Sequence, residues 1–302
     1  MSMRAQPLCG RLAIALSVVA ALACGREAAE EAEQAMQAAM ASVEHTIPEL
    51  NMPESVRVGP DGRYYVSEIG EFGRDGDGRI VALDPETWEP AVYATGLNDP
   101  KGLAFRGEML YATDGDRVVG LSASGDVEQV IGPDAFPSPP VFLNDLTVGP
   151  DGALYVSDSG PFDAVEGAIY RIDPAGTVTA VITSDDSPEI AAPNGLTFDP
   201  DGHLLAVDHS SGKLLRIEDG GVSVLAEGLG GGDGLEFAPD GTLYVTDVSG
   251  GRVLRVSFGP TGATVDELTR VSRAADLGLD AARGRLLIPQ LQENSVTVVR
   301  MP

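Results

Sequence analysis

The chain has 302 residues and carries 46 acidic against 20 basic side chains, which gives a formal net charge of −26. Such an excess of negative charge disfavours contact with nucleic acids and anionic lipid surfaces, so we expect no nucleic-acid-binding role. The two cysteines of the sequence, Cys9 and Cys24, both lie near the N-terminus. The rest of the chain is therefore expected to form no internal disulfide and to use no thiol chemistry.

The first 23 residues have the pattern of a signal peptide. Arg4 and Arg11 precede an uncharged run over residues 12–23, which is shorter than the roughly 20 apolar residues that span a bilayer but typical of a signal-peptide core. The run ends in Ala-Leu-Ala before Cys24, an order that resembles the lipobox of bacterial lipoproteins. We therefore predict a signal peptide over 1–23 and lipidation of Cys24, with an ordinary cleaved signal as the alternative. The protein is then extracytoplasmic, either tethered to a bacterial membrane through its lipid alone or free in the periplasm or medium.

Residues 24–45 are predicted to form an acidic tether. The segment is rich in alanine and glutamate and lacks a broad apolar face. We expect it to be a solvated spacer, helical or frayed, that separates the following domain from the membrane.

From residue 46 to the C-terminus a short unit recurs six times. Each unit has an apolar strand, a turn and a second strand, and the turns fall at 60–62, 106–107, 150–152, 200–202, 239–241 and 283–284. Short β-branched and aromatic runs bounded by Gly, Asp and Ser indicate hairpins. The spacing of about 39 to 50 residues is typical of four-stranded propeller blades. We therefore predict one all-β domain over 46–302, a six-bladed β-propeller.

The last unit indicates how the ring closes. It has only three evident strands, at 276–279, 285–289 and 295–300. An open ring would leave a long edge strand, which favours aggregation. We expect residues 46–50 to add the missing outer strand and close the ring.

One position at the start of the first strand changes its residue type from unit to unit. A position that only packs would keep its residue type, as the turns do, so this variation indicates a binding site. In a propeller the first strand of each blade lines the central channel, and its start lies on the same face as the end of the antiparallel second strand. The varying residues should therefore surround one mouth of the channel: Glu54, Lys101, Asn144, Asn194, Asp233 and Ala275.

Four of these six side chains carry oxygen, two as carboxylates and two as amides. An oxygen-only site with a charge of about −2 suits Ca²⁺, which takes about 6–8 oxygen ligands. The alternative is that these residues only form hydrogen bonds at strand ends. The acidic residues that end the second strands hardly vary, and we predict that they stabilise turns: Asp114, Asp158, Asp208 and Asp247.

Lys101 is the cation among the residues at the predicted mouth. Two roles are open to it. Its ammonium group orients a substrate carboxylate, or it turns away into a salt bridge with Asp145 or Asp276.

The chain has three histidines, and one of them is expected near the site. His45 lies in the predicted tether, and His203 lies on a turn of the opposite face. His209 follows a second strand and is the histidine that could reach the mouth, as a proton shuttle near neutral pH. The alternative is an exposed loop histidine with no role in the site.

With these motifs the chain resembles the SMP-30/gluconolactonase/LRE-like family of six-bladed calcium propellers. The resemblance covers all six units and rests on Pro53-Glu54-Ser55-Val56, Leu143-Asn144-Asp145-Leu146, Pro193-Asn194-Gly195-Leu196 and Asp233-Gly234-Leu235. It implies that Glu54, Asn194 and Asp233 bind one divalent cation, with Asn144 as a ligand or substrate contact. The implied cofactor is Ca²⁺, or another divalent cation such as Mg²⁺, Mn²⁺ or Zn²⁺. Glu54 departs from the pattern, because many lactonases have Gly-Glu-Gly-Pro around this position.

The resemblance and the site residues together favour an exported, gluconolactonase-like hydrolase that cleaves a lactone or ester with the help of a metal ion. In that reading Asp233 is the candidate base, and Asn144, Lys101 and His209 are further candidate catalytic residues. The main alternative is a non-catalytic propeller with a structural calcium that binds a glycan, peptide or partner protein. A third is a lyase or synthase similar to strictosidine synthase. The expected partner is a small molecule, and we expect a monomer.

Overall fold

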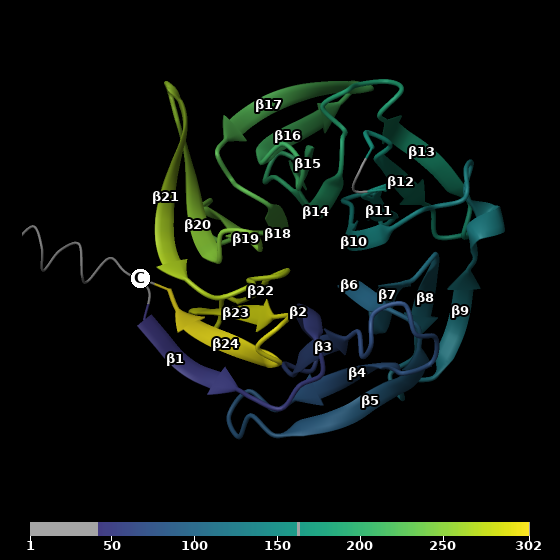
Figure 1. The fold of residues 1–302 in the computed structure, drawn as a ribbon, viewed down its shortest axis with the longest axis vertical. Helices are drawn as coiled ribbons and strands as arrows, with labels where there is room; N and C mark the ends of the chain where they lie inside the picture. Colours follow the sequence, from purple (N-terminus) through teal and green to yellow (C-terminus); the bar gives the residue numbers. More distant parts are fainter. Residues whose placement is uncertain (1–41, 162–163, 302) are drawn as a thin grey trace, which may run out of the picture. The chain divides into compact units, whose positions relative to one another are not determined.

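The computed structural model describes residues 42–161 and 164–301, which form six four-stranded antiparallel sheets arranged in a ring (Figure 1). The predicted signal peptide, Cys24 and most of the predicted tether lie outside the described residues. The predicted all-β fold with six blades is confirmed.

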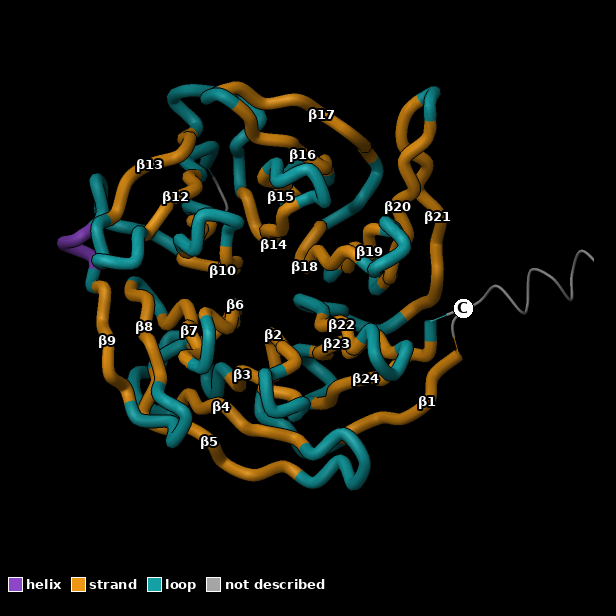
Figure 2. Tube along the Cα trace, turned by 180° about the vertical axis from the view of Figure 1, so that it is seen from behind, coloured by secondary structure: helices purple, strands orange, loops and turns teal. Residues whose placement is uncertain are grey.

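The blades follow one another along the chain, and each begins with its innermost strand (Figure 2). Blade 1 comprises β2 (Pro53–Val58), β3 (Tyr64–Glu68), β4 (Gly78–Leu83) and β5 (Pro90–Leu97). Blade 2 comprises β6 (Pro100–Arg106), β7 (Met109–Asp114), β8 (Arg117–Leu121) and β9 (Val127–Ile131), and a short 3₁₀ helix, η1 (Pro133–Ala135), follows it. Blade 3 comprises β10 (Leu143–Val148), β11 (Leu154–Asp158), β12 (Ala168–Ile172) and β13 (Val178–Thr183).

The second half of the ring repeats this order. Blade 4 comprises β14 (Pro193–Phe198), β15 (Leu204–Asp208), β16 (Lys213–Glu218) and β17 (Gly221–Glu227). Blade 5 comprises β18 (Gly232–Phe237), β19 (Leu243–Asp247), β20 (Arg252–Gly259) and β21 (Gly262–Arg270). Blade 6 comprises β22 (Gly278–Asp280), β23 (Arg285–Gln290), β24 (Ser295–Arg300) and, as its outer strand, β1 (Ser42–Ile47).

The N-terminal strand closes the ring, as predicted. Strand β1 pairs antiparallel with β24, from Ser42 opposite Arg300 to Ile47 opposite Val296. The strand begins four residues before the predicted domain start, so His45 belongs to the propeller and not to the tether. Its ring stacks on Trp88 of blade 1, with 4.8 Å between centroids. Blade 6 is thus tied to both ends of the described chain.

Hydrophobic layers between neighbouring blades form the core. Tyr65 and Ile80 of blade 1 belong to one buried cluster with Leu103, Leu110 and Val119 of blade 2. The same arrangement recurs between other pairs of blades. Each sheet packs on both faces because the ring gives it two neighbours, and its side chains interdigitate with theirs.

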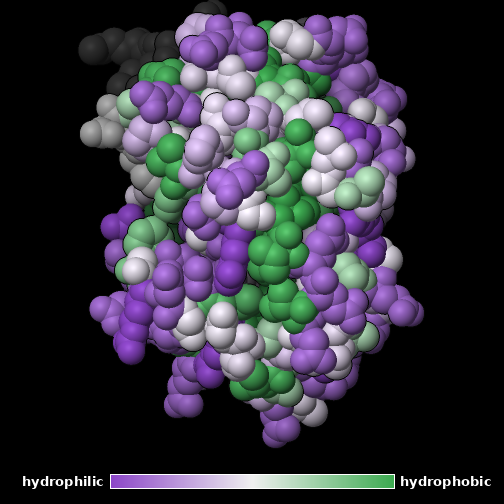
Figure 3. Space-filling model, turned by 90° about the vertical axis from the view of Figure 1, so that its right-hand side faces the viewer, coloured by the Kyte–Doolittle hydropathy of each residue, from purple (hydrophilic) through white to green (hydrophobic). Residues whose placement is uncertain are grey.

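Hydrophilic residues predominate on the side of the ring that faces the viewer in Figure 3. Figure 3 shows one side of the ring, where hydrophobic residues form a band between hydrophilic ones. Within the described residues no helix is long and apolar enough to cross a bilayer.

Candidate metal site at the mouth of the channel

Five inner strands begin with the same irregular pairing, which turns their second residue toward the channel. In blade 1, Pro53 pairs with Glu68, and the next regular pair is Val56 with Val66. In blades 2 to 5 the second and third residues of the inner strand likewise have no partner in the regular pairing. Such a bulge redirects side chains at the end of a sheet. The second residues of these five strands are the predicted mouth residues Glu54, Lys101, Asn144, Asn194 and Asp233.

Hydroxyl groups on the second strands satisfy the amides that the bulges free. The amide of Ser55 donates to Ser67 Oγ at 2.9 Å, and the amide of Gly234 donates to Thr246 Oγ1 at 2.8 Å. Asp145 has the same bond to Ser157 in blade 3. Buried amides need such partners, so these small hydroxyl residues hold the mouth residues in place.

The acidic residues at the second-strand ends hold the chain that leads into each inner strand. Asp114 accepts from the amide of Asn98 at 2.6 Å, and Asp208 accepts from the amide of Ala192 at 2.7 Å. Asp158 and Asp247 accept equivalent bonds in blades 3 and 5. The prediction that these aspartates stabilise turns is confirmed. Glu68 has this role in blade 1, where it accepts from the amide of Asn51.

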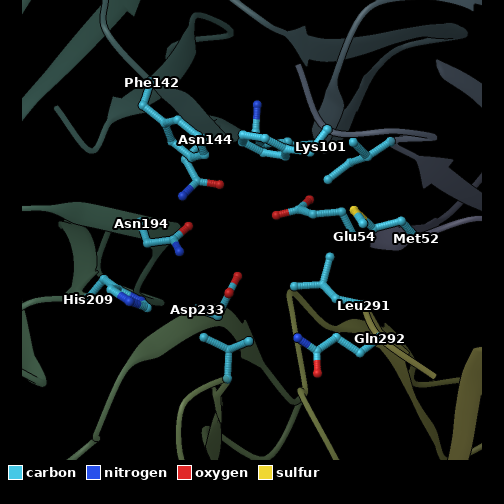
Figure 4. Close-up of a pocket in the computed structure, with 13 residues that line it drawn as sticks. Met52, Glu54, Lys101, Phe142, Asn144, Asn194, His209, Asp233, Leu291 and Gln292 are labelled. Carbon is cyan, nitrogen blue, oxygen red and sulfur yellow. The ribbon is translucent and has the colours of Figure 1, made fainter. Parts of the chain in front are cut away.

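The structure brings the mouth residues together around one pocket of about 330 Å³. Figure 4 shows the side chains of Glu54, Asn144, Asn194 and Asp233 pointing toward its centre. All four are buried. Ala275, the sixth residue of the predicted column, precedes β22 and contributes no polar group.

Two carboxylate oxygens of this pocket lack a hydrogen-bond donor among the described residues. They are Glu54 Oε2 and Asp233 Oδ1, and both are buried. Burial raises the pKa of each carboxyl group well above its usual value, and the charges of neighbouring carboxylates add to the rise. Buried carboxylates are stable when a cation pairs with them. An oxygen-only set with two unpartnered carboxylate oxygens therefore fits a divalent cation such as Ca²⁺.

A hydroxyl relay orients the amide of Asn144. Its Nδ2 donates to Ser159 Oγ at 3.1 Å, and this hydroxyl donates to the carbonyl oxygen of Pro193 at 2.9 Å. With the amide nitrogen held on that side, the amide oxygen faces the pocket (Figure 4). Ser159, which the sequence analysis did not single out, thus positions the Asn144 side chain.

Lys101 lies along the wall of the pocket beside Phe142. Its Nζ lies 4.5 Å from the centre of the Phe142 ring and donates to the carbonyl oxygen of Asp99 at 3.3 Å. Burial lowers the pKa of the Lys101 ammonium group, and the nearby Glu54 carboxylate acts in the opposite direction. No ion pair of Lys101 with Asp145 or Asp276 is present in the described part of the chain, so the structure gives no support to that alternative.

Arg57 occupies the channel next to the pocket. It pairs with Asp145 and Asp276, the two aspartates considered as partners of Lys101. Its guanidinium lies 3.0 Å from Asp276, 3.4 Å from Glu236 and 3.7 Å from Asp145. It also donates to the carbonyl oxygen of Leu277 at 2.6 Å. Burial raises the pKa of Asp145 to about 8 and that of Glu236 to about 7, although Arg57 opposes both shifts. This network joins blades 1, 3, 5 and 6 and was missed in the sequence analysis.

The two remaining histidines lie as expected from the repeat. His209 lines the pocket, and its Nδ1 faces the carbonyl oxygen of Gly232 at 3.3 Å. His203 lies on the turn between β14 and β15. There its Nδ1 is 2.9 Å from Asp199 and its Nε2 is 3.5 Å from Glu218.

The same turn holds a group of side chains that the sequence analysis did not single out. Ligand atoms of Asp199, Asp201 and His203 all lie within 4.8 Å of one another, so the group could hold a metal ion. Asp199 is already an acceptor for the amides of Asp201 and His203. These bonds account for its position without a cation.

Comparison with known proteins gives a family and a fold. Residues 96–210 match the family described as SMP-30/Gluconolactonase/LRE-like region. No curated protein matches the chain. Three solved structures illustrate the fold: a gluconolactonase from Xanthomonas campestris (18% identity, TM-score 0.67, 87% of this chain and 95% of that chain); a PQQ-bound aldose sugar dehydrogenase from Streptomyces coelicolor (18%, 0.64, 86% and 97%); and a streptogramin B lyase (14%, 0.60, 85% and 97%).

These three structures have different activities by their descriptions, so the likeness to them shows the fold alone. The family match is more specific, because it spans Lys101, Asn144, Asn194 and His209 of the pocket. The match over residues 96–210 and the six-bladed ring bear out the predicted resemblance to the SMP-30/gluconolactonase/LRE-like family.

Proposed function

We propose that the protein is a metal-dependent hydrolase of a lactone or ester. The observation that carries the proposal is the pair of buried, unpartnered carboxylate oxygens on Glu54 and Asp233, which face two amide side chains in one pocket. The structural neighbour described as a gluconolactonase supports the same chemistry.

Four side chains would hold the cation: Glu54, Asn144, Asn194 and Asp233. Their oxygen-only chemistry favours Ca²⁺ over softer metals. A bound cation of this kind supplies Lewis-acid polarisation of the substrate carbonyl and stabilises the charge that develops on its oxygen. The relay from Asn144 through Ser159 keeps one ligand oxygen aimed into the pocket.

Asp233 is the residue that we assign as the general base. Its carboxylate is buried and points into the pocket. In the proposed reaction it accepts the proton of the water that attacks the carbonyl carbon. His209 lines the same pocket, and an imidazole can carry a proton between a pocket and solvent near neutral pH. Lys101 would contact a carboxylate of the substrate where one is present.

The test is turnover of a panel of lactones and aryl esters, with and without a chelator. We expect a chelator to abolish hydrolysis and Ca²⁺ to restore it. Asp233→Asn keeps an oxygen while it removes the base, and we expect it and Asn144→Ala each to lower the rate by about 10²–10³-fold. Asp240→Asn is the matched control, because Asp240 lies on a turn of the opposite face and accepts from the amide of Thr242. If His209 carries protons, His209→Ala should lower the rate by about 10²-fold.

Hydrolysis that never exceeds background, or that a chelator does not affect, would refute the proposal. Cation binding without turnover would instead favour the alternative of a binding module with a structural calcium.

We also propose that the protein is exported as a monomer, with Cys24 as its lipidation site, on the strength of the signal-peptide pattern in the sequence.

A further inference from the structure

The pocket has a polar floor and apolar walls. The floor consists of the four proposed ligands, whereas the walls rise from loops on the same face of the ring. Most of the wall residues are hydrophobic: Met52, Ile69, Phe72, Phe142, Val248 and Leu291. A substrate that reaches the floor with its carbonyl group therefore lies with its remaining atoms against hydrocarbon.

Few polar groups are available above the floor. In the described part of the pocket they are Lys101, His209 and Gln292. The ammonium of Lys101 faces the Phe142 ring and the carbonyl of Asp99, so it lies to one side. A sugar lactone carries hydroxyl groups on several sides of its ring, and burying them without partners lowers affinity. The walls are thus poorly matched to a polyhydroxylated ring.

Two phenylalanines define the apolar wall at the entrance. The rings of Phe72 and Phe142 are stacked, with centroids 6.0 Å apart and planes at 26°. Phe72 lies between β3 and β4 with 56% of its surface exposed, and Val141, next to Phe142, is also exposed. Exposed apolar groups that gather beside a pocket indicate a binding surface. The exposure of Phe72 and Val141 shows that this wall reaches the protein surface, so it can contact a substituent that extends out of the pocket.

We propose that the site selects lactones or esters that carry an alkyl or aryl substituent over sugar lactones, and that Phe72 and Phe142 bind this substituent. The inference rests on the proposed function for the reaction, but the substituent site is argued from the walls alone. Burial of each additional CH₂ group should raise kcat/KM by about fourfold until the wall is covered.

The first measurement is kcat/KM for γ-lactones with side chains from methyl to hexyl, and for glucono-δ-lactone. We expect kcat/KM to rise with chain length and to exceed that for the sugar lactone. Phe72→Ala should lower kcat/KM for the hexyl lactone by about tenfold or more and flatten the rise of kcat/KM with chain length. Phe258→Ala is the matched control, because Phe258 is also exposed but lies outside the pocket. Equal or better hydrolysis of the sugar lactone, or no effect of Phe72→Ala, would overturn the inference and leave the hydrolase intact.

The second measurement separates the substituent site from the reaction. Alkyl lactams resist hydrolysis, and their binding can be followed by calorimetry in the wild type and in Phe72→Ala. Binding that strengthens with chain length and weakens in Phe72→Ala supports the substituent site even if no lactone is turned over. Absence of lactam binding, or binding that chain length does not change, overturns it.

Discussion

Replacement of Arg57 by methionine should destabilise the propeller strongly, and more so at high pH. The guanidinium faces Asp145, Glu236 and Asp276 in the channel and has only 13% of its side chain exposed. Methionine keeps much of the length of the side chain but removes the charge and the bond to Leu277. The three carboxylates would then repel one another with no cation between them.

The magnitude follows from the burial of the pairs. At ~3 Å and an effective dielectric of ~20, one such pair has a Coulomb energy of about 5 kcal/mol. Desolvation offsets part of this, and loss of one partner of a buried pair typically costs about 3–5 kcal/mol. For a domain of this size each kcal/mol lowers Tm by about 2–4 °C. We expect a loss of about 6–20 °C at pH 8.

The pH dependence gives the prediction a second readout. Asp145 and Glu236 have pKa values of about 8 and 7, raised by burial. A carboxyl group with a raised folded-state pKa contributes stability that is present at low pH and lost as pH rises through that value. At pH 5 both carboxyl groups are protonated and need no counter-charge. The decrease in Tm caused by Arg57→Met should therefore be smaller at pH 5 than at pH 8.

Scanning calorimetry of Arg57→Met and Arg171→Met at pH 5 and pH 8 provides the test. Arg171 pairs with Asp151 at 2.7 Å, but both side chains are about one third exposed, so that its replacement should cost below about 1 kcal/mol. Equal decreases in Tm in the two variants would refute the reasoning. So would a decrease in the Tm of Arg57→Met that is the same at both pH values.

Three further predictions concern the site and the N-terminus. The rise in Tm that Ca²⁺ causes in a thermal shift assay should be larger at pH 8 than at pH 5. The raised pKa values of Glu54 and Asp233 make the metal-free protein less stable as pH rises, and a bound cation offsets that decline. Equal rises in Tm at both pH values would contradict this. Ser159→Ala should weaken Ca²⁺ binding by about 10–100-fold in calorimetry, whereas the exposed Ser124→Ala should not, and unchanged affinity would rule out the relay. Cys24→Ser should prevent incorporation of labelled fatty acid in a bacterial host; a wild type that takes up no label would leave a plain secreted protein.

The turns and the mouth residues could be predicted because their chemistry repeats at fixed positions. Pro-Asp-Gly turns, present in four of the six units, and β-branched strands are local signals, and the six units reinforce one another. Once the repeat was aligned, the residues at the mouth followed from one offset within the unit. The bulge that aims them inward was not visible in the sequence, since it depends on pairing between two strands.

Features that depend on ring closure could not be predicted in the same way. The start of β1 was missed because residues 42–45 continue the polar character of the tether. Their partners lie in β23 and β24, where Arg285 and Arg300 pair with Glu44. Arg57 lies in the sequence Val-Arg-Val, which is typical of a strand with one solvated face. Its partners come from three other blades, and no local pattern brings these residues together.

The charges in the channel determine how many cations the protein should hold. Arg57 provides the positive charge for the carboxylates of Asp145 and Asp276. Glu54 and Asp233 are therefore left as the carboxylates of the channel mouth that need a cation. We therefore expect one Ca²⁺ per chain, measured by elemental analysis after dialysis against a low concentration of the ion, and none in Asp233→Ala. A second equivalent that is lost in Asp201→Asn would place a cation at the exposed turn with Asp199 and His203. One equivalent that survives in Asp233→Ala would contradict the assignment of the cation to the channel mouth.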